Sequence, residues 1–345
     1  MLKKIFRYFI IFFFIILIII VLIEILGPAF KGFFSYNHLP QKIIINHFEK
    51  SNLTEFTLKK DFSGRHLASE AKFDTIVTTD TNNQRITKNN NNNKEKVYIF
   101  GDSFVFGHGV NDNETMPFYL QKENLNFSFQ NLGFTAGRDL TSYYVWLKEY
   151  VGIKNIFNGI IVFYKNDIED MRRNKCFNSI NKEVDLLNDD CVNIESNFEI
   201  LNGKLYEKKS FLLEKLYPFY TLLKRSYSVA LVRVYYDYII KYFNKPDMVD
   251  SKKENRIQLN QKERDNIKYI LRYFKNNINL MGLVLIDYDS NNLFYDYIID
   301  VSNEMDVKII KIDSLDIKYR IGINDPHYNK AGNQKVAKII NDELF

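Results

Sequence analysis

From Val97 onward, hydrophobic and polar positions alternate in blocks that predict a regular sequence of strands and helices. Short apolar or aromatic runs bounded by turn residues predict strands at 97–100, 127–132, 159–164, 281–288 and 307–313. Longer stretches with apolar residues at helical spacing predict helices at about 115–124, 139–150, 261–278, 290–303 and 329–343. Strands that are apolar throughout and are separated by helices predict a parallel sheet that is covered on both faces.

The N-terminus carries the most apolar segment of the chain. No charged residue occurs between Tyr8 and Ile23, whereas Lys3, Lys4 and Arg7 precede this run. With its flanks the segment covers residues 5–26, and about 20 residues suffice to cross a hydrocarbon core of about 30 Å. Its length and the weak small-residue spacing after it favour a membrane anchor; a cleaved signal peptide and a buried core helix are the alternatives. The basic flank predicts a cytoplasmic N-terminus, with the rest of the chain in the periplasm or at the cell surface.

These patterns predict three regions. Residues 1–30 form a cytoplasmic tip and transmembrane anchor, and 31–96 form an extracytoplasmic stalk and linker with an edge strand at 73–78. Residues 97–345 form the main α/β domain, in which 171–260 interrupt the alternation. Apolar and aromatic residues recur there at helical spacing between lysines and arginines, which predicts a helical insertion that packs on the core or caps the site. Contact with the membrane surface or with a partner protein is the alternative.

Composition narrows the class of protein. The hydrophobic content of 46% predicts a large packed core. The formal net charge is only +5, and the basic residues are scattered among nearly as many acids. Without a basic stripe, nucleic-acid binding is disfavoured.

The two cysteines, Cys176 and Cys191, lie in one polar stretch. An exported chain can join them in a disulfide, which would stabilise the fold by roughly 3 kcal/mol; two unpaired thiols are the alternative. No histidine or second cysteine pair lies nearby, so a zinc site is disfavoured. We expect neither a metal ion nor another cofactor.

Candidate chemistry begins at Ser103, directly after the first strand in "VYIFGDSFVFGHGV". Ligand chemistry in parallel sheets takes place at the carboxyl ends of the strands. A serine nucleophile needs a base, usually a histidine that a carboxylate orients. His327, in "GINDPHYNKAGN", lies between the last strand and the last helix, and Asp325 precedes it by two positions. This loop is expected at the same edge of the sheet as Ser103.

The other histidines are not expected in the site. His38, His47 and His66 precede the main domain, and His108 is interpreted as a turn or rim residue. Acyl chemistry also needs hydrogen-bond donors for the oxyanion, each of which lowers the activation barrier by about 3 kcal/mol. Gly133, through its backbone N–H, and Asn166, through its side-chain amide, follow the second and third strands.

Taken in order, Gly101-Asp102-Ser103, Asn131-Leu132-Gly133, Asn166-Asp167 and Asp325-Pro326-His327 resemble the sequence blocks of the SGNH (GDSL-type) hydrolases. The segments "GDSFVFGHGV" and, before it, "TTDTNNQR" resemble sequences of the membrane-anchored bacterial branch of this family. The resemblance covers roughly residues 75–170 and 280–343. It implies a flavodoxin-like three-layer α/β/α fold with a mostly parallel five-stranded sheet. It also implies Ser103 as nucleophile, His327 as general base and Asp325 as orienting acid. The oxyanion hole would combine the backbone N–H of Ser103 with Gly133 and Asn166.

Two positions depart from the common family pattern. Lys165 stands where a glycine often precedes Asn-Asp, and Asn324 stands where many members have the acid. Asp325 instead matches a shorter Asp-x-His spacing found in relatives that include polysaccharide acetyltransferases. We expect a membrane-anchored serine esterase that acts outside the cytoplasm on an acylated, for example acetylated, envelope glycan or lipid. An O-acyltransferase of a surface polysaccharide and a non-catalytic anchored glycan-binding or assembly protein are the alternatives.

Overall fold

The structure is a computed structural model that describes residues 2–27, 29, 43–44, 47–51, 55–68, 73–87, 94–134, 139–151, 157–173, 177, 198–201, 204–207, 226–232, 234–235, 258–322 and 325–345. The contacts divide the chain into two compact units. The larger unit comprises 44–67, 72–208 and 253–345, and the smaller comprises 1–43, 68–71 and 209–252.

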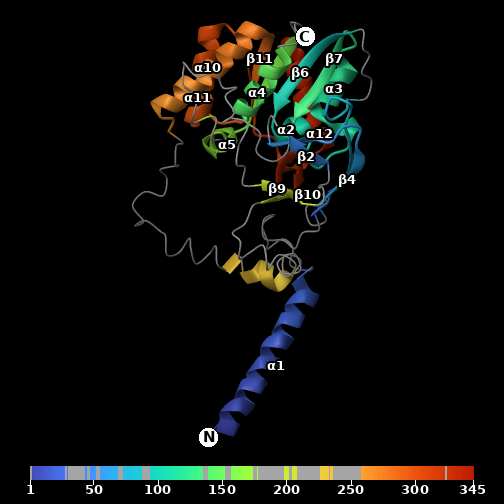
Figure 1. The fold of residues 1–345 in the computed structure, drawn as a ribbon, viewed down its shortest axis with the longest axis vertical. Coiled ribbons are helices and arrows are strands. Elements are labelled where there is room, and N and C mark those ends of the chain that lie inside the picture. Colours follow the sequence, from blue (N-terminus) through green and yellow to red (C-terminus); the bar gives the residue numbers. More distant parts are fainter. Residues whose placement is uncertain are drawn as a thin grey trace. The chain divides into compact units, whose positions relative to one another are not determined.

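A five-stranded parallel sheet forms the centre of the larger unit (Figure 1). Its strands are β6 (Glu95–Gly101), β7 (Phe127–Gly133), β8 (Asn158–Phe163), β11 (Asn279–Tyr288) and β12 (Ile309–Asp313). They lie in the order β12-β11-β8-β6-β7, and every neighbouring pair is parallel. This is the flavodoxin-like order, which reverses direction between β6 and β8 and places ligand sites at their carboxyl ends. The predicted strands and fold class are confirmed.

Helices cover both faces of this sheet (Figure 1). One face packs against α4 (Leu140–Val151), α10 (Gln261–Asn277) and α11 (Leu293–Met305). The other packs against the short α2 (Ser103–Phe106), α3 (Met116–Glu123) and α12 (Lys330–Leu344). The helices predicted from the apolar spacing are therefore present, and their starts follow local capping. For example, α11 begins after Asn292, whose side chain accepts the N–H of Phe294 at 3.0 Å.

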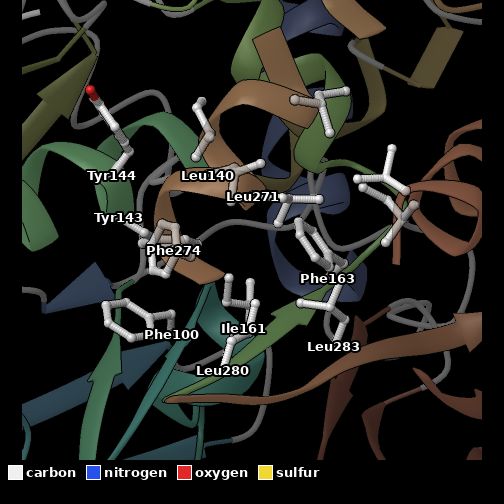
Figure 2. Packing of buried hydrophobic residues seen from close by; sticks show 14 of the residues in the cluster. Phe100, Leu140, Tyr143, Tyr144, Ile161, Phe163, Leu271, Phe274, Leu280 and Leu283 are labelled. Atoms are coloured by element: carbon white, nitrogen blue, oxygen red, sulfur yellow. The ribbon is translucent and has the colours of Figure 1, made fainter. Parts of the chain in front are cut away.

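Side chains of one strand alternate between the two faces of the sheet. On the face that α4, α10 and α11 cover, Phe100 of β6 and Ile161 of β8 point toward the helices. There they belong to one buried cluster with Phe274 of α10 and Leu140 of α4 (Figure 2). Ile99, the neighbour of Phe100, is buried in the cluster on the opposite face. Because both faces are covered, both sets of positions must be apolar, which explains the continuous apolar runs.

A second layer of strands precedes the central sheet. β1 (Ile43–Ile44), β4 (Ser63–Ala68) and β5 (Phe73–Thr78) form one small sheet, and β2 (Phe48–Ser51) and β3 (Glu55–Leu58) form a hairpin. The edge strand predicted at 73–78 is present: β5 lies beside β4 at the edge of this small sheet.

Buried side chains in this layer correct the expected stalk. His47, Phe48, Leu58 and Val77 are all buried within the larger unit. The unit therefore begins well before the boundary expected at Val97. Sequence inspection misses this because short strands in an irregular order leave a weaker pattern than long helices.

The remaining elements of the larger unit are short. They are η2 (Asp112–Glu114), α5 (Asp167–Arg173), η3 (Ile317–Tyr319) and the hairpins β9 (Phe198–Leu201) with β10 (Lys204–Glu207) and β13 (Arg320–Gly322) with β14 (Asp325–Tyr328). The β9–β10 hairpin lies in the insertion that was expected to be helical, so that expectation is wrong for 198–201 and 204–207. Cys176 and Cys191 lie outside the described residues.

The smaller unit contains α1 (Leu2–Leu26) and a helical stretch at 227–232 and 234–235. By length and composition, residues Phe6–Leu26 could cross a membrane. The described side chains of this segment are mainly exposed apolar groups. The helix coincides with the segment predicted as an anchor.

Candidate active site

Ser103 is the first residue of α2 and follows directly on the sharp turn at the end of β6. β6 ends at Gly101, and the side chain of Asp102 caps α2 by accepting the N–H of Phe104 at 2.9 Å. α2 ends at Gly107, whose φ of +84° favours glycine and whose N–H donates to the Ser103 carbonyl at 3.0 Å. The three residues after Ser103 are buried, whereas Ser103 itself is partly exposed. The turn therefore presents the hydroxyl at the carboxyl end of β6.

His327 and Asp325 reach this hydroxyl from β14. His327 Nε2 lies 2.7 Å from Ser103 Oγ, and His327 Nδ1 lies 2.6 Å from Asp325 Oδ1. The same Asp325 oxygen accepts the backbone N–H of His327 at 3.0 Å. The structure thus brings together the three residues that the sequence proposed as nucleophile, base and acid.

The charge of Asp325 determines which ring nitrogen of His327 carries a proton. Burial alone would raise the pKa of Asp325. The hydrogen bonds from His327 and the electrostatic attraction between its ring and the carboxylate outweigh burial, so the pKa of Asp325 is lowered. An ionised Asp325 accepts from Nδ1–H, which leaves Nε2 with a lone pair toward Ser103 Oγ–H. This is the arrangement that proton removal from serine requires.

Arg320 holds the hairpin that carries the histidine. Its guanidinium forms an ion pair with Asp287 at 2.9 Å and donates to the Pro326 carbonyl at 2.6 Å. Asp287 lies at the end of β11 and also accepts from the Tyr328 hydroxyl at 3.1 Å. The sheet thereby positions the backbone between Asp325 and His327. No sequence signal marked Arg320 or Asp287, because only the fold joins these distant positions.

Arg85 orders the loop on the other side of Ser103. Its side chain is fully buried and donates to the carbonyls of Phe106 at 2.8 Å, Gly107 at 2.7 Å and Val110 at 2.7 Å. Asp112 balances its charge at 2.8 Å. Arg85 belongs to the stretch "TTDTNNQR", which the sequence comparison singled out without a role. Its role is to bind the backbone that follows α2.

Gly133 does not have the arrangement expected of an oxyanion donor. Its single N–H donates to the side chain of Asn131 at 2.9 Å. A Cβ at Gly133 would lie 2.0 Å from the backbone nitrogen of Phe106. A glycine is therefore required here because β7 and α2 approach closely. The hydrogen bond to Asn131 stands against the oxyanion role predicted for Gly133, and the close packing gives the glycine a separate structural role.

Asn166 lies in the short loop between β8 and α5, directly before α5, at the expected edge of the sheet. Its amide donates one hydrogen to Asp170 Oδ2 at 3.0 Å. An amide carries a second hydrogen, which keeps its capacity to donate to an oxyanion.

Carboxyl groups surround this edge of the sheet. Burial raises the pKa of Asp102 to about 6 and raises that of Asp167 well above its usual value. Asp102 serves here as the cap of α2 rather than as the partner of His327.

Four histidines form a row that ends at the site. Ring centroids are 4.5 Å apart between His327 and His108, 4.8 Å between His108 and His66, and 5.2 Å between His66 and His47. Burial lowers the pKa of His108 and His47 to about 3, and that of His66 well below 6.5, so these rings are neutral. His108 is on the predicted turn but contacts His327. His47 and His66, expected outside the domain, are in its interior because the N-terminal strands pack there.

Among the residues that the structure describes, one group of side chains has metal-ligand chemistry. Ligand atoms of His108, Asp325 and His327 lie within 4.8 Å of one another. Both ring nitrogens of His327, however, are within hydrogen-bond distance of Ser103 and Asp325. A metal ion would have to displace one of these partners, so this arrangement fits proton transfer better than a resident cation.

Comparisons with known proteins identify only distant structural likenesses. No family model and no curated protein match the chain. Among solved structures, a protein described as lipolytic and of the G-D-S-L family from Desulfitobacterium hafniense is 12% identical. The alignment covers 73% of this chain and 100% of that one, with a TM-score of 0.39.

Two further structures align over similar lengths. A member of the lipolytic protein G-D-S-L family from Veillonella parvula is 10% identical, with 72% and 97% of the two chains covered and a TM-score of 0.38. A catalytic mutant of Axe2, an acetylxylan esterase from Geobacillus stearothermophilus, is 12% identical, with 75% and 96% covered and a TM-score of 0.36. At these scores the functional argument rests on the geometry of the site.

Proposed function

We propose that this chain is a serine-dependent carboxylic ester hydrolase. One observation carries the proposal: Ser103 Oγ, the His327 ring and Asp325 form a continuous line of contacts of 2.7 and 2.6 Å at the carboxyl end of β6. A hydroxyl, an imidazole and a carboxylate in this order are the groups that activate a serine.

In the first half of the reaction, His327 Nε2 accepts the proton of Ser103 Oγ as that oxygen attacks the ester carbonyl. The tetrahedral intermediate collapses with cleavage of the bond to the leaving alcohol, which takes the proton from His327. The acyl group is then bound to Ser103 as an ester. Asp325 stays ionised throughout and stabilises the imidazolium.

Water completes the second half of the reaction. His327 removes a proton from the water, the hydroxide attacks the acyl carbon, and Ser103 Oγ leaves and regains a proton from His327. The products are a carboxylic acid and free enzyme. For the oxyanion we retain the backbone N–H of Ser103 and the side chain of Asn166, because the Gly133 N–H already donates to Asn131.

The proposed location is outside the cytoplasm, at the membrane surface. The apolar helix at Phe6–Leu26 and the basic residues before it support an anchor with a cytoplasmic N-terminus. The proposed substrates are acyl esters, such as acetyl esters, of a cell-envelope glycan or lipid. Such substrates are accessible to a site on this side of the membrane.

Active-site labelling tests the proposal directly. The full-length chain in detergent should react with a fluorophosphonate probe and hydrolyse p-nitrophenyl acetate, and Ser103→Ala should lose both activities. Labelling or turnover that persists in Ser103→Ala would contradict the assignment. A sugar added as a competing acceptor would reveal acyl transfer as an O-acetylated product in addition to free acetate.

A further inference from the structure

Within the smaller unit, Glu24 joins the end of α1 to a segment that is distant in sequence, residues 226–235. The Ser226 hydroxyl donates to Glu24 Oε1 at 2.5 Å. The backbone N–H groups of Tyr227 and Ser228 donate to the two carboxylate oxygens, each at 2.9 Å. The first N–H groups of a helix have no partner within the helix, and Glu24 supplies one here. The carboxylate therefore caps the helical stretch that begins at 227.

Side-chain packing extends this contact along α1. Tyr227 and Ala230 are buried against Ile23 and Val234. The Tyr227 ring occupies the space beside Gly27, where a Cβ would lie 2.2 Å from the ring. The segment 226–235 thus packs against the last turns of α1 (gold and dark blue in Figure 1).

The opposite side of the segment is apolar and is not covered by any of the described residues. Leu231 is 37% exposed, Val232 67% and Tyr235 64%. In sequence, the basic residues Lys224, Arg225 and Arg233 flank or interrupt these positions. Apolar and aromatic groups among basic residues are typical of helices that lie in the membrane interface, where tyrosine is enriched.

We propose that residues 226–235 contact the outer leaflet of the bilayer beside the end of α1, with lipid as the partner of Leu231, Val232 and Tyr235. The proposal rests on α1 spanning the membrane. The Ser228 hydroxyl donates to the carbonyl of Ile20 at 3.4 Å. At a rise of about 1.5 Å per residue, Ile20 lies about 9 Å inside the end of the helix at Leu26. These contacts hold the segment along the last turns of α1, where its exposed side chains would meet headgroups and the outer part of the acyl chains.

Lipid quenching of tryptophan fluorescence tests this depth. The full-length chain, which has one tryptophan, would be reconstituted in vesicles of phosphatidylethanolamine and phosphatidylglycerol. A fraction of the lipids would carry bromine near the headgroup or deep in the acyl chains. Each variant is compared with the parent chain, so that the signal of Trp146 is subtracted. We expect Val232→Trp to be quenched at least twofold more by shallow than by deep bromines.

Matched variants separate the possible outcomes. Phe14→Trp, in the middle of α1, should be quenched most by deep bromines, and Leu125→Trp, exposed in the larger unit, gives the reference level for a position outside the smaller unit. Quenching at position 14 without quenching at position 232 would overturn the lipid contact, and so would burial of the introduced indole at position 232 between copies of the chain or against another protein. Absence of quenching at position 14 would overturn both the span and this inference, while esterase activity would test the catalytic proposal separately.

A second variant tests the role of Glu24. In the Val232→Trp background, Glu24→Leu removes the acceptor of three hydrogen bonds, and we expect quenching at position 232 to fall toward the level of the Leu125→Trp control. Glu24→Gln retains one carbonyl acceptor and should retain part of the signal. Equal quenching in the Leu variant would overturn Glu24 as the residue that positions the segment.

Discussion

Ser103 Oγ lies 2.7 Å from His327 Nε2, although the two residues are 224 positions apart in the chain. Ser103 lies directly after the turn that follows β6, and His327 lies in β14. The contact therefore depends on the whole α/β core between them, and its consequences can be measured.

Removal of either residue should abolish turnover. We expect Ser103→Ala and His327→Ala each to lower kcat for p-nitrophenyl acetate by roughly 10⁴- to 10⁶-fold, because members of a triad act as a unit. The double variant should be no slower than the single ones. Circular dichroism would show that the variants remain folded, and additive losses in the double variant would contradict a shared role.

Substitution of Asp325 separates charge from geometry. Asp325→Asn keeps an oxygen that can accept the His327 backbone N–H but removes the negative charge beside Nδ1. Turnover should fall by roughly 10³- to 10⁴-fold, with slow fluorophosphonate labelling of Ser103 still detectable. An unchanged rate would mean that another group orients the histidine.

The buried histidines should make the protein sensitive to acid. In the folded state the pKa of His47 is lowered from 6.5 to about 3 because of burial. The unfolded chain therefore binds a proton below pH 6.5 that the folded chain excludes. The stability is complete above this pH and is lost as the pH falls toward 3, by about 1.4 kcal/mol per pH unit for each such histidine.

His47→Phe tests this pH dependence in urea unfolding experiments. Neither ring nitrogen of His47 has a hydrogen-bond partner among the described residues. The imidazole stacks on the Phe106 ring, with the two ring centroids 5.3 Å apart. Phenylalanine should therefore fit without loss at pH 8 and reduce the decline of the unfolding free energy between pH 6 and pH 4. A slope identical to that of the parent chain would contradict a neutral, buried His47.

Gly133 should tolerate no side chain. In Gly133→Ala the Cβ meets the backbone of α2 at Phe106, so we expect a loss of about 1–3 kcal/mol in the free energy of unfolding and slower labelling of Ser103. Gly322→Ala is a matched control, because no described atom lies within 4 Å of its Cβ position. Equal stability of the two variants would contradict the close approach of β7 and α2.

Arg85 should be essential for stability. Arg85→Met leaves Asp112 and several loop carbonyls without their buried donor, and we expect a loss of about 3–5 kcal/mol in the free energy of unfolding. Arg65→Met removes an exposed ion pair with Asp74 and should leave denaturant unfolding unchanged. A parent-like midpoint for Arg85→Met would contradict its role in the loop after Ser103.

The amino-acid sequence by itself determined the central sheet, because continuous apolar strands and amphipathic helices are local patterns. It also determined the candidates Ser103, Asp325 and His327, because turn residues directly after strands converge at one edge of a parallel sheet. The helix α1 could be predicted for the same reason, because its length and apolar composition belong to one continuous stretch of the sequence.

Only the tertiary structure decided the rest. The Gly133 N–H proved to be occupied by Asn131, and Arg85 and Arg320 proved to hold the loops on either side of the site. The row of His47, His66 and His108 likewise arises from the packing of the N-terminal strands against α2 and the loop after it. Most of these contacts join residues that are distant in sequence and become neighbours only when the chain folds. A local sequence pattern therefore cannot predict them.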